Sequence, residues 1–259
     1  MDIQKAVTAL LEAEIHKKPI EPFTSSIEVI SVDDAYQIQL QQIRRKVENG
    51  SVIVGKKIGL TSKVMQEMFN VNQPDYGHIL NDMIFDDGET ISLKRFIQPK
   101  AEFEIAFVLK KDLHGPGITL RDVIDATEYV VPALEIIDSR IKDWQIKFED
   151  RVADNGSSAG AVIGKKTTPI NGHDLARIGM RVYKNGEFLD SAVGAAVMGH
   201  PAMAVAWLAN ALGSYGISLH AGEFILAGAL TKAVVIEPGD TFTAEFDHLG
   251  SVSATFNRK

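Results

Sequence analysis

The spacing of apolar residues changes character about 70 residues into the chain. The first eighteen residues carry apolar positions at helical spacing, namely Ile3, Val7, Leu10, Leu11 and Ile15. The stretch "VDDAYQIQLQQIRRKVENG" predicts a second helix that ends at Asn49-Gly50. After it, "SVIVGKKIGL" is β-branched and interrupted by glycine, which predicts a strand with Lys56 and Lys57 near its end. We therefore expect residues 1–75 to form a helical N-terminal portion.

From about residue 80 the pattern changes to apolar segments separated by turn sequences. "FDDGE", "KNGEF" and "EPGDT" each lie between two such segments and predict strand connections. Two helices interrupt the strands: one begins at "TLRD", where Thr119 and Asp122 have capping-box spacing, and one follows His200-Pro201. The fold class is therefore α+β, with a mixed-β catalytic domain over residues 76–259.

Composition adds limits to this picture. The chain has 259 residues, 45% of them hydrophobic, which is enough to bury a sizeable core. Its net charge of −7 is spread without long runs of one sign, which argues against binding to nucleic acid or an anionic membrane. There are no cysteines, so disulfides and thiolate metal sites are excluded. No run of about 18 apolar residues predicts a membrane span, and we expect a cytoplasmic protein that acts on a small substrate.

The segment "KAEFEIAFVL" places two glutamates in an apolar strand. Side chains two apart share a face of a strand, so Glu102 and Glu104 lie on one face and Phe103, Ile105 and Phe107 on the other. Two like charges side by side are unfavourable unless a positive charge lies between them or the face is wet. An isolated pair of this kind is most simply a solvated sheet face.

A second acidic residue changes this interpretation. Glu135 lies in the apolar run "EYVVPALEIIDSR", and a buried carboxylate needs a cation or hydrogen-bond donors. One candidate is an ion pair with Arg140; the other is a divalent metal shared with Glu102 and Glu104. Three carboxylates suit Mg²⁺ or Mn²⁺, whereas zinc prefers histidine or cysteine.

Several motifs together carry a family resemblance. In order they are "GKKIGLTS", "QPDYG", "PKAEFEIAFVL", "PALEIIDSRIKDW", "VADNGSS", "GHPAMAVAWLAN" and "AGEFILAGAL". This series resembles the hydratase/decarboxylase branch of the fumarylacetoacetate hydrolase superfamily, which includes 2-oxopent-4-enoate hydratases and 4-oxalocrotonate decarboxylases. The resemblance implies a roll-like or barrel-like mixed β core with a smaller helical N-terminal portion. It also implies that Glu102, Glu104 and Glu135 bind Mg²⁺ or Mn²⁺.

Within this branch the motifs favour a hydratase. "QPDYG", with Asp75, and "SRIKDWQIKFEDRVADN" resemble the hydratases, whereas "LHGPG" and "GAAVMGHP" are close to the decarboxylases. The family's Thr-Gly before the last core strand is Ala227-Gly228 here, which puts a substrate contact in doubt. The implied reaction is hydration of 2-hydroxypenta-2,4-dienoate to 4-hydroxy-2-oxopentanoate in the breakdown of aromatic compounds. The alternative is decarboxylation of 4-oxalocrotonate.

The resemblance also implies roles for other residues. Lys57 is the first candidate for the proton shuttle, since a lysine beside a metal can have a lowered pKa, and Asp75 is the candidate base or water-positioning group. Leu60, Ser157 and Asp154 are the candidate substrate-binding residues. Without the resemblance, Lys57 reads as a surface lysine, Asp75 as a turn residue after Pro74, and Ser157 and Asp154 as loop formers.

Other functional classes stay open. One alternative is hydrolytic C–C cleavage, but the helical front end has no convincing His-Glu pair to activate a water. Another is a non-enzymatic metal-bound scaffold, and the presence of the three glutamates together with Lys57 argues against it. His200, before Pro201, reads as a helix cap rather than a metal ligand. The resemblance also implies a homo-oligomer, and a possible complex with the companion decarboxylase or hydratase.

Overall fold

The computed structural model describes residues 2–25 and 30–258. The α-helices are α1 Ile3–His16, α2 Val32–Glu48, α3 Lys63–Met68, α4 Leu120–Ala126, α5 Phe148–Ala153 and α6 Pro201–Gly213. Short 3-10 helices cover Phe23–Ser25, Asn81–Met83, Leu93–Arg95, Lys142–Trp144, Asn155–Ser157, Leu175–Arg177 and Gly194–Ala196.

The predicted helices are present, and α2, α4 and α6 begin where the sequence indicates, whereas α3 and α5 were not predicted. Ser31 and Asp34 form a capping box at the start of α2, and Asn49 caps its end. Thr119 and Asp122 form the predicted capping box of α4. The His200 side chain accepts a hydrogen bond from the Ala202 backbone N–H ahead of α6, which confirms its capping role.

The strands form two sheets. Their bounds are β1 Ile53–Gly59, β2 Asp75–Leu80, β3 Ile84–Asp86, β4 Thr90–Ser92, β5 Lys100–Leu109, β6 Thr127–Ile137, β7 Ser158–Ile163, β8 Gly179–Lys184, β9 Glu187–Val193, β10 Phe224–Leu226, β11 Val234–Val235, β12 Thr241–Phe246 and β13 Gly250–Asn257. In the described part of the chain, the larger sheet has the order β2-β1-β10-β5-β6-β7-β3, with β11 also paired to β5. The smaller sheet has the order β4-β13-β12-β8-β9.

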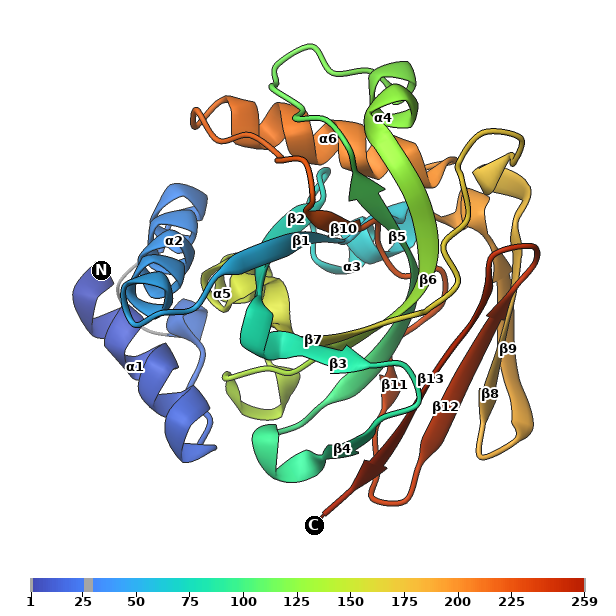
Figure 1. Cartoon of the computed structure of the whole chain (residues 1–259). Helices are drawn as coiled ribbons and strands as arrows, with labels where there is room; N and C mark the ends of the chain where they lie inside the picture. Colours follow the sequence, from blue (N-terminus) through green and yellow to red (C-terminus); the bar gives the residue numbers. More distant parts are fainter. Residues whose placement is uncertain (1, 26–29, 259) are drawn as a thin grey trace.

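The large sheet lies between helices and the second sheet (Figure 1). Helices α1 and α2 lie together beside it, the five-stranded sheet lies on the opposite side, and α6 crosses above β1 and β10. Strand β13 packs against β6 and β7, which joins the two sheets. Phe103, Ile105 and Phe107 of β5 are fully buried in the resulting core, and burial of each such side chain contributes about 1.5–3 kcal/mol.

The α+β class and the mixed-β core with a smaller helical N-terminal portion are confirmed. The division into residues 1–75 and 76–259 stays a proposal. Strand β1 comes from the first part, yet it lies between β2 and β10 in the large sheet. Helices α1 and α2, from the same part of the chain, lie together beside the large sheet.

One stretch, Gly194–Gly213, is long and apolar enough to cross a membrane by length and composition, with a mean hydropathy of 1.3. Its α-helical part, α6, has 13 residues and is therefore about 20 Å long, against about 30 Å for a hydrocarbon core. Its inward residues are buried against the protein core, namely Pro201, Ala202, Ala204, Val205, Ala206, Leu208, Ala209 and Leu212. This stretch therefore packs as a core helix.

Candidate active site

Three glutamates converge on one face of the large sheet. Strands β5 and β6 are antiparallel with Glu102 opposite Glu135, and Glu104 lies two residues further along β5. One carboxylate oxygen from each residue lies within 4.8 Å of the others. Glu104 and Glu135 are fully buried, so the alternative of a solvated sheet face is wrong for this pair of strands.

The backbone beside the cluster holds one of these carboxylates. The Gly228 N–H donates a 2.7 Å hydrogen bond to Glu104 Oε2. Gly228 has φ +114°, and a Cβ there would come within 2.5–3.0 Å of the Thr61 side chain, so this position requires glycine. The Ala227-Gly228 pair therefore contributes a backbone donor to the cluster, and this contact needs no hydroxyl at position 227.

Among the described residues, Lys57 is the cation that pairs with the glutamate cluster. It is fully buried on β1, and its Nζ lies 3.3 Å from Glu135 Oε2. The expected partner Arg140 does not reach Glu135, because its Nε pairs with Asp154. The neighbouring Lys56 instead pairs with Glu223, with both oxygens at 2.7 Å. The reading of Lys57 as a surface lysine is therefore wrong.

Burial and charge shift the pKa values of this cluster. Burial raises the pKa of Glu104 well above its ordinary value, and the carboxylates of Glu135 and Glu102 raise it further. Burial also raises the pKa of Glu135, to about 7, against the opposing charge of Lys57. Burial is the largest single effect on the pKa of Lys57 and lowers it, but the carboxylates of Glu135, Glu102 and Asp75 together outweigh burial, and the net direction is upward. The lowered pKa expected for Lys57 refers to the site with a metal beside it and stays a prediction.

Asp75 lies at the start of β2, fully buried, next to an arginine that the sequence did not single out. Arg151 Nε of α5 donates a 2.5 Å hydrogen bond to Asp75 Oδ2. Arg151 also acts on the glutamates, because its charge is among those opposing the rise in the pKa of Glu135. A lone arginine in the six-residue helix "FEDRVA" carries no sequence signal for such a position.

The remaining substrate-binding candidates lie at different places. Ser157, in the segment Asn155–Ser157, is fully buried, and its Oγ has no hydrogen-bond partner within the described residues. The Asn155 side chain fixes this segment on β2 by accepting from the His78 N–H and donating to the His78 carbonyl. Leu60 follows β1 with φ +55° and packs in the main core.

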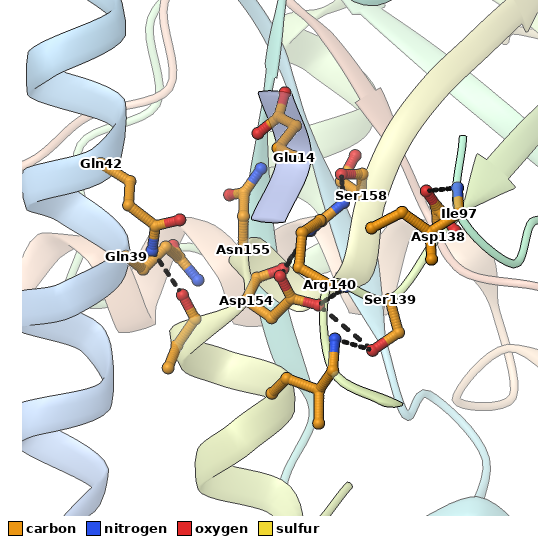
Figure 2. A network of polar contacts seen from close by, with 12 residues as sticks. Glu14, Gln39, Gln42, Ile97, Asp138, Ser139, Arg140, Asp154, Asn155 and Ser158 are labelled. Carbon is orange, nitrogen blue, oxygen red and sulfur yellow. Dashed lines mark hydrogen bonds and ion pairs between the residues drawn. The ribbon is translucent and has the colours of Figure 1, made fainter. Parts of the chain in front are cut away.

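Asp154 belongs to a separate buried network (Figure 2). Its Oδ1 accepts from Arg140 Nε at 2.5 Å and its Oδ2 from the Arg140 N–H at 3.0 Å. Arg140 also donates to the carbonyls of Ser158 and Asp154. The structure thus gives Asp154 a partner that its sequence position did not predict, and does not bring its side chain to the glutamates.

The residues of the cluster fit a divalent cation. In the described structure, Glu104 Oε1 and both oxygens of Glu135 are buried without a hydrogen bond, which is costly unless a cation is bound. When ionised, Asp75 and the three glutamates carry four negative charges, and Lys57 and Arg151 supply two positive ones. A divalent ion balances this charge, and oxygen ligands are those that hard cations prefer.

Comparisons with known proteins agree with this geometry. The family model described as "Fumarylacetoacetate (FAA) hydrolase C-terminal" matches residues 56–257. The chain is 49% identical to 2-hydroxyhexa-2,4-dienoate hydratase of Comamonas testosteroni, covering 95% of this chain and 94% of that protein. It is 45% identical to 2-keto-4-pentenoate hydratase of Paraburkholderia xenovorans (strain LB400), covering 98% and 94%.

A solved structure is also similar. It is the 4-oxalocrotonate decarboxylase from Pseudomonas putida G7 complexed with magnesium and adipate, with a TM-score of 0.95 and 39% identity, covering 98% of this chain and 97% of that one. A second structure of that decarboxylase holds calcium and acetate.

Proposed function

The chain belongs to the fumarylacetoacetate hydrolase family, and we propose that it is the metal-dependent hydratase that adds water to 2-hydroxypenta-2,4-dienoate in aromatic-compound catabolism. The product is 4-hydroxy-2-oxopentanoate, and the enzyme is a hydro-lyase. The observation that carries the proposal is the buried cluster of Glu102, Glu104, Glu135 and Lys57, in a chain 45–49% identical to proteins named as hydratases.

Glu102, Glu104 and Glu135 would hold the metal, for which we propose Mg²⁺ or Mn²⁺. The ion would supply Lewis-acid stabilisation of the negative charge that develops on the 2-oxygen of the substrate. The glutamates place this charge stabilisation in a site closed to bulk water, where it has its largest effect.

Lys57 moves protons in this proposal. Its Nζ is buried beside Glu135 and makes no hydrogen bond within the described residues, so it is available to the substrate. With its raised pKa it starts as an ammonium, delivers a proton to C5 and takes up the proton of the 2-hydroxyl group, which gives 2-oxopent-3-enoate and restores the ammonium.

Asp75 orients the water that then adds at C4, with a proton added at C3. Its Oδ2 is held by Arg151, whereas its Oδ1 has no hydrogen-bond partner among the described residues and can accept from a water. Ser157 Oγ, also without such a partner, binds the substrate carboxylate. Leu60 and Asp154 support the site from neighbouring positions; we assign Asp154 no direct substrate contact while it is paired with Arg140.

A second candidate function is 4-oxalocrotonate decarboxylation. The observation that favours it is the TM-score of 0.95 to a decarboxylase. Loss of CO₂ leaves a dienolate, whose negative charge needs the same stabilisation as the hydration reaction. The hydratase proposal is preferred because the named hydratases are more similar in sequence, at 45–49% against 39%.

The proposal is tested by removing and restoring the metal. Protein treated with a chelator is offered 2-hydroxypenta-2,4-dienoate, alone and after addition of Mg²⁺ or Mn²⁺, and the product is identified by NMR. We expect 4-hydroxy-2-oxopentanoate only in the metal-loaded samples. Undiminished turnover after complete metal removal would overturn the role given to the glutamates.

We further propose a cytoplasmic homo-oligomer, with a possible complex with the companion decarboxylase. Light scattering on the purified protein, with and without a decarboxylase of the same family, tests both assemblies. A monomer that does not change with the second protein would contradict both.

A further inference from the structure

Several neighbouring residues hold the buried ion pair of Asp75 and Arg151 in place. Asp75 is fully buried and Arg151 is 5% exposed. The contact uses Arg151 Nε and Asp75 Oδ2, which leaves Asp75 Oδ1 without a hydrogen bond within the described residues. One carboxylate oxygen is therefore fixed by the arginine, and the other is a buried acceptor without a donor among the described residues.

The strand beneath the pair leaves room for it. A Cβ at Gly59 would lie 2.2 Å from Asp75 Oδ1 and 2.4 Å from Arg151 Nη2. Gly59 is opposite Asp75 in the pairing of β1 with β2. Glycine at this position thus allows the two charged side chains to lie directly over the strand that also carries Lys57.

A glutamine from the N-terminal helices fixes the two backbone segments that carry the pair. Gln39 of α2 is fully buried, and its Nε2 donates to the Tyr76 carbonyl at 2.9 Å and to the Val152 carbonyl at 2.8 Å. Tyr76 follows Asp75 and Val152 follows Arg151 in the sequence. One amide group therefore ties together the residues next to each member of the pair.

The neighbouring Gln42 provides a useful contrast. Its Nε2 donates to the carbonyls of Ala153 and Ile38, so it holds α5 but does not reach β2. Figure 2 shows both glutamines on α2.

From this geometry we propose that Arg151 is a positioning residue for Asp75 in the water-addition step, and that Gln39 sets the alignment of the two. The inference rests on the proposed hydratase function. Arg151 holds Oδ2 so that Oδ1 points to the water that adds at C4, and Gln39 keeps β2 and α5 at the spacing this requires. The helical N-terminal portion thereby contributes to hydration without touching the substrate.

The first test separates the two chemical steps. Ketonisation is followed by loss of the dienol absorbance, and hydration by NMR of the 4-hydroxy product. In Arg151→Gln we expect hydration to fall on the order of a hundredfold, the cost of a misplaced group, and ketonisation much less. The Asp75→Asn variant should show the same pattern, and the double variant should be no worse than either single one. An equal loss of both steps, or unchanged hydration, would overturn the proposal.

Two further variants keep the test valid if Arg151→Gln does not fold. Gly59→Ala retains every charge but displaces the pair, and it should lower hydration selectively. Gln39→Met removes only the link between Tyr76 and Val152 and should do the same, whereas the matched variant Gln42→Met should not. Equal effects of Gln39→Met and Gln42→Met on the ratio of hydration to ketonisation would contradict the role of Gln39.

An NMR measurement that needs no turnover distinguishes a failure of this inference from a failure of the proposed function. In ¹H–¹⁵N spectra the Arg151 Nε–H, buried and bonded to a carboxylate, should give a downfield resonance protected from exchange with solvent. It should disappear in Asp75→Asn and weaken in Gln39→Met. Failure of the wild type to hydrate any dienoate would remove the proposed function, whereas absence of this resonance would remove the pair itself.

Discussion

Replacement of Glu104 by glutamine tests the metal site through stability rather than turnover. The substitution preserves the size of the side chain and an oxygen acceptor for the Gly228 N–H, which in the wild type donates to Glu104 Oε2 at 2.7 Å. It removes one of three converging carboxylates, two of which are fully buried. Because burial and the carboxylates of Glu135 and Glu102 all raise the pKa of Glu104 and so disfavour its charge, we expect the metal-free variant to be at least as stable as the metal-free wild type.

The effect on metal binding should be opposite and large. Loss of a group that only supports a metal ligand costs about 10–100-fold in affinity, so we expect loss of a ligand to raise the Kd about 100-fold or more. At a metal concentration of about 100 times the wild-type Kd, the metal stabilises the wild type by about 2.7 kcal/mol. The same concentration stabilises the variant by about 0.4 kcal/mol or less.

Thermal unfolding with and without Mg²⁺ or Mn²⁺ measures this difference. For a chain of this size, 1 kcal/mol corresponds to roughly 2–4 °C in Tm. The metal should therefore raise the Tm of the wild type by about 5–11 °C and that of Glu104→Gln by about 2 °C or less. Glu223→Gln is the control, since Glu223 is also largely buried but pairs with Lys56 outside the cluster. Its metal-induced shift should match that of the wild type. Equal metal-induced shifts in Glu104→Gln and the wild type would refute the reasoning.

Three further predictions follow from other buried groups. Lys57→Gln should lower kcat on the order of 10²–10⁴-fold, the usual contribution of a proton-transfer group, while Lys56→Gln should keep turnover at temperatures where it stays folded; equal losses would contradict the assignment. Burial lowers the pKa of His78 to about 3, so the unfolded chain binds a proton there between pH 6.5 and 3 and the folded one does not. Stability should fall as pH falls through this range, by up to about 1.4 kcal/mol per unit, and urea unfolding of His78→Gln should show a shallower fall. Asp154→Asn should destabilise the protein by about 3–5 kcal/mol, because it leaves the Arg140 charge buried without its partner; a loss below about 1 kcal/mol in urea unfolding would contradict this.

Much of the fold could be predicted because local signals agree with the tertiary structure. The capping boxes at Ser31 and Thr119 mark true helix starts, and each turn sequence lies between two strands. The strands on either side of "KNGEF", β8 and β9, pair with each other. The predicted strand "KAEFEIAFVL" coincides with β5, since its alternation places phenylalanines in the core and glutamates on the other face.

The parts of the candidate site that depend on contacts between distant segments could not be predicted from the sequence. The Glu135 position could be identified because a carboxylate in an apolar run needs a partner, but its partner is Lys57, 78 positions away, rather than the nearby Arg140. The Arg151–Asp75 contact joins segments 76 residues apart, and no spacing rule links a short helix to the start of a distant strand. Strand β1 shows the same limit, since its place in the large sheet follows from pairing with β2 and with the distant β10.

The measurement that tests the account most directly offers two substrates separately to the metal-loaded protein, with products identified by NMR. We expect 2-hydroxypenta-2,4-dienoate to be converted to 4-hydroxy-2-oxopentanoate and 4-oxalocrotonate to be left intact. Release of CO₂ from 4-oxalocrotonate, with 2-hydroxypenta-2,4-dienoate accumulating unhydrated, would contradict the hydratase assignment and identify the chain as a decarboxylase.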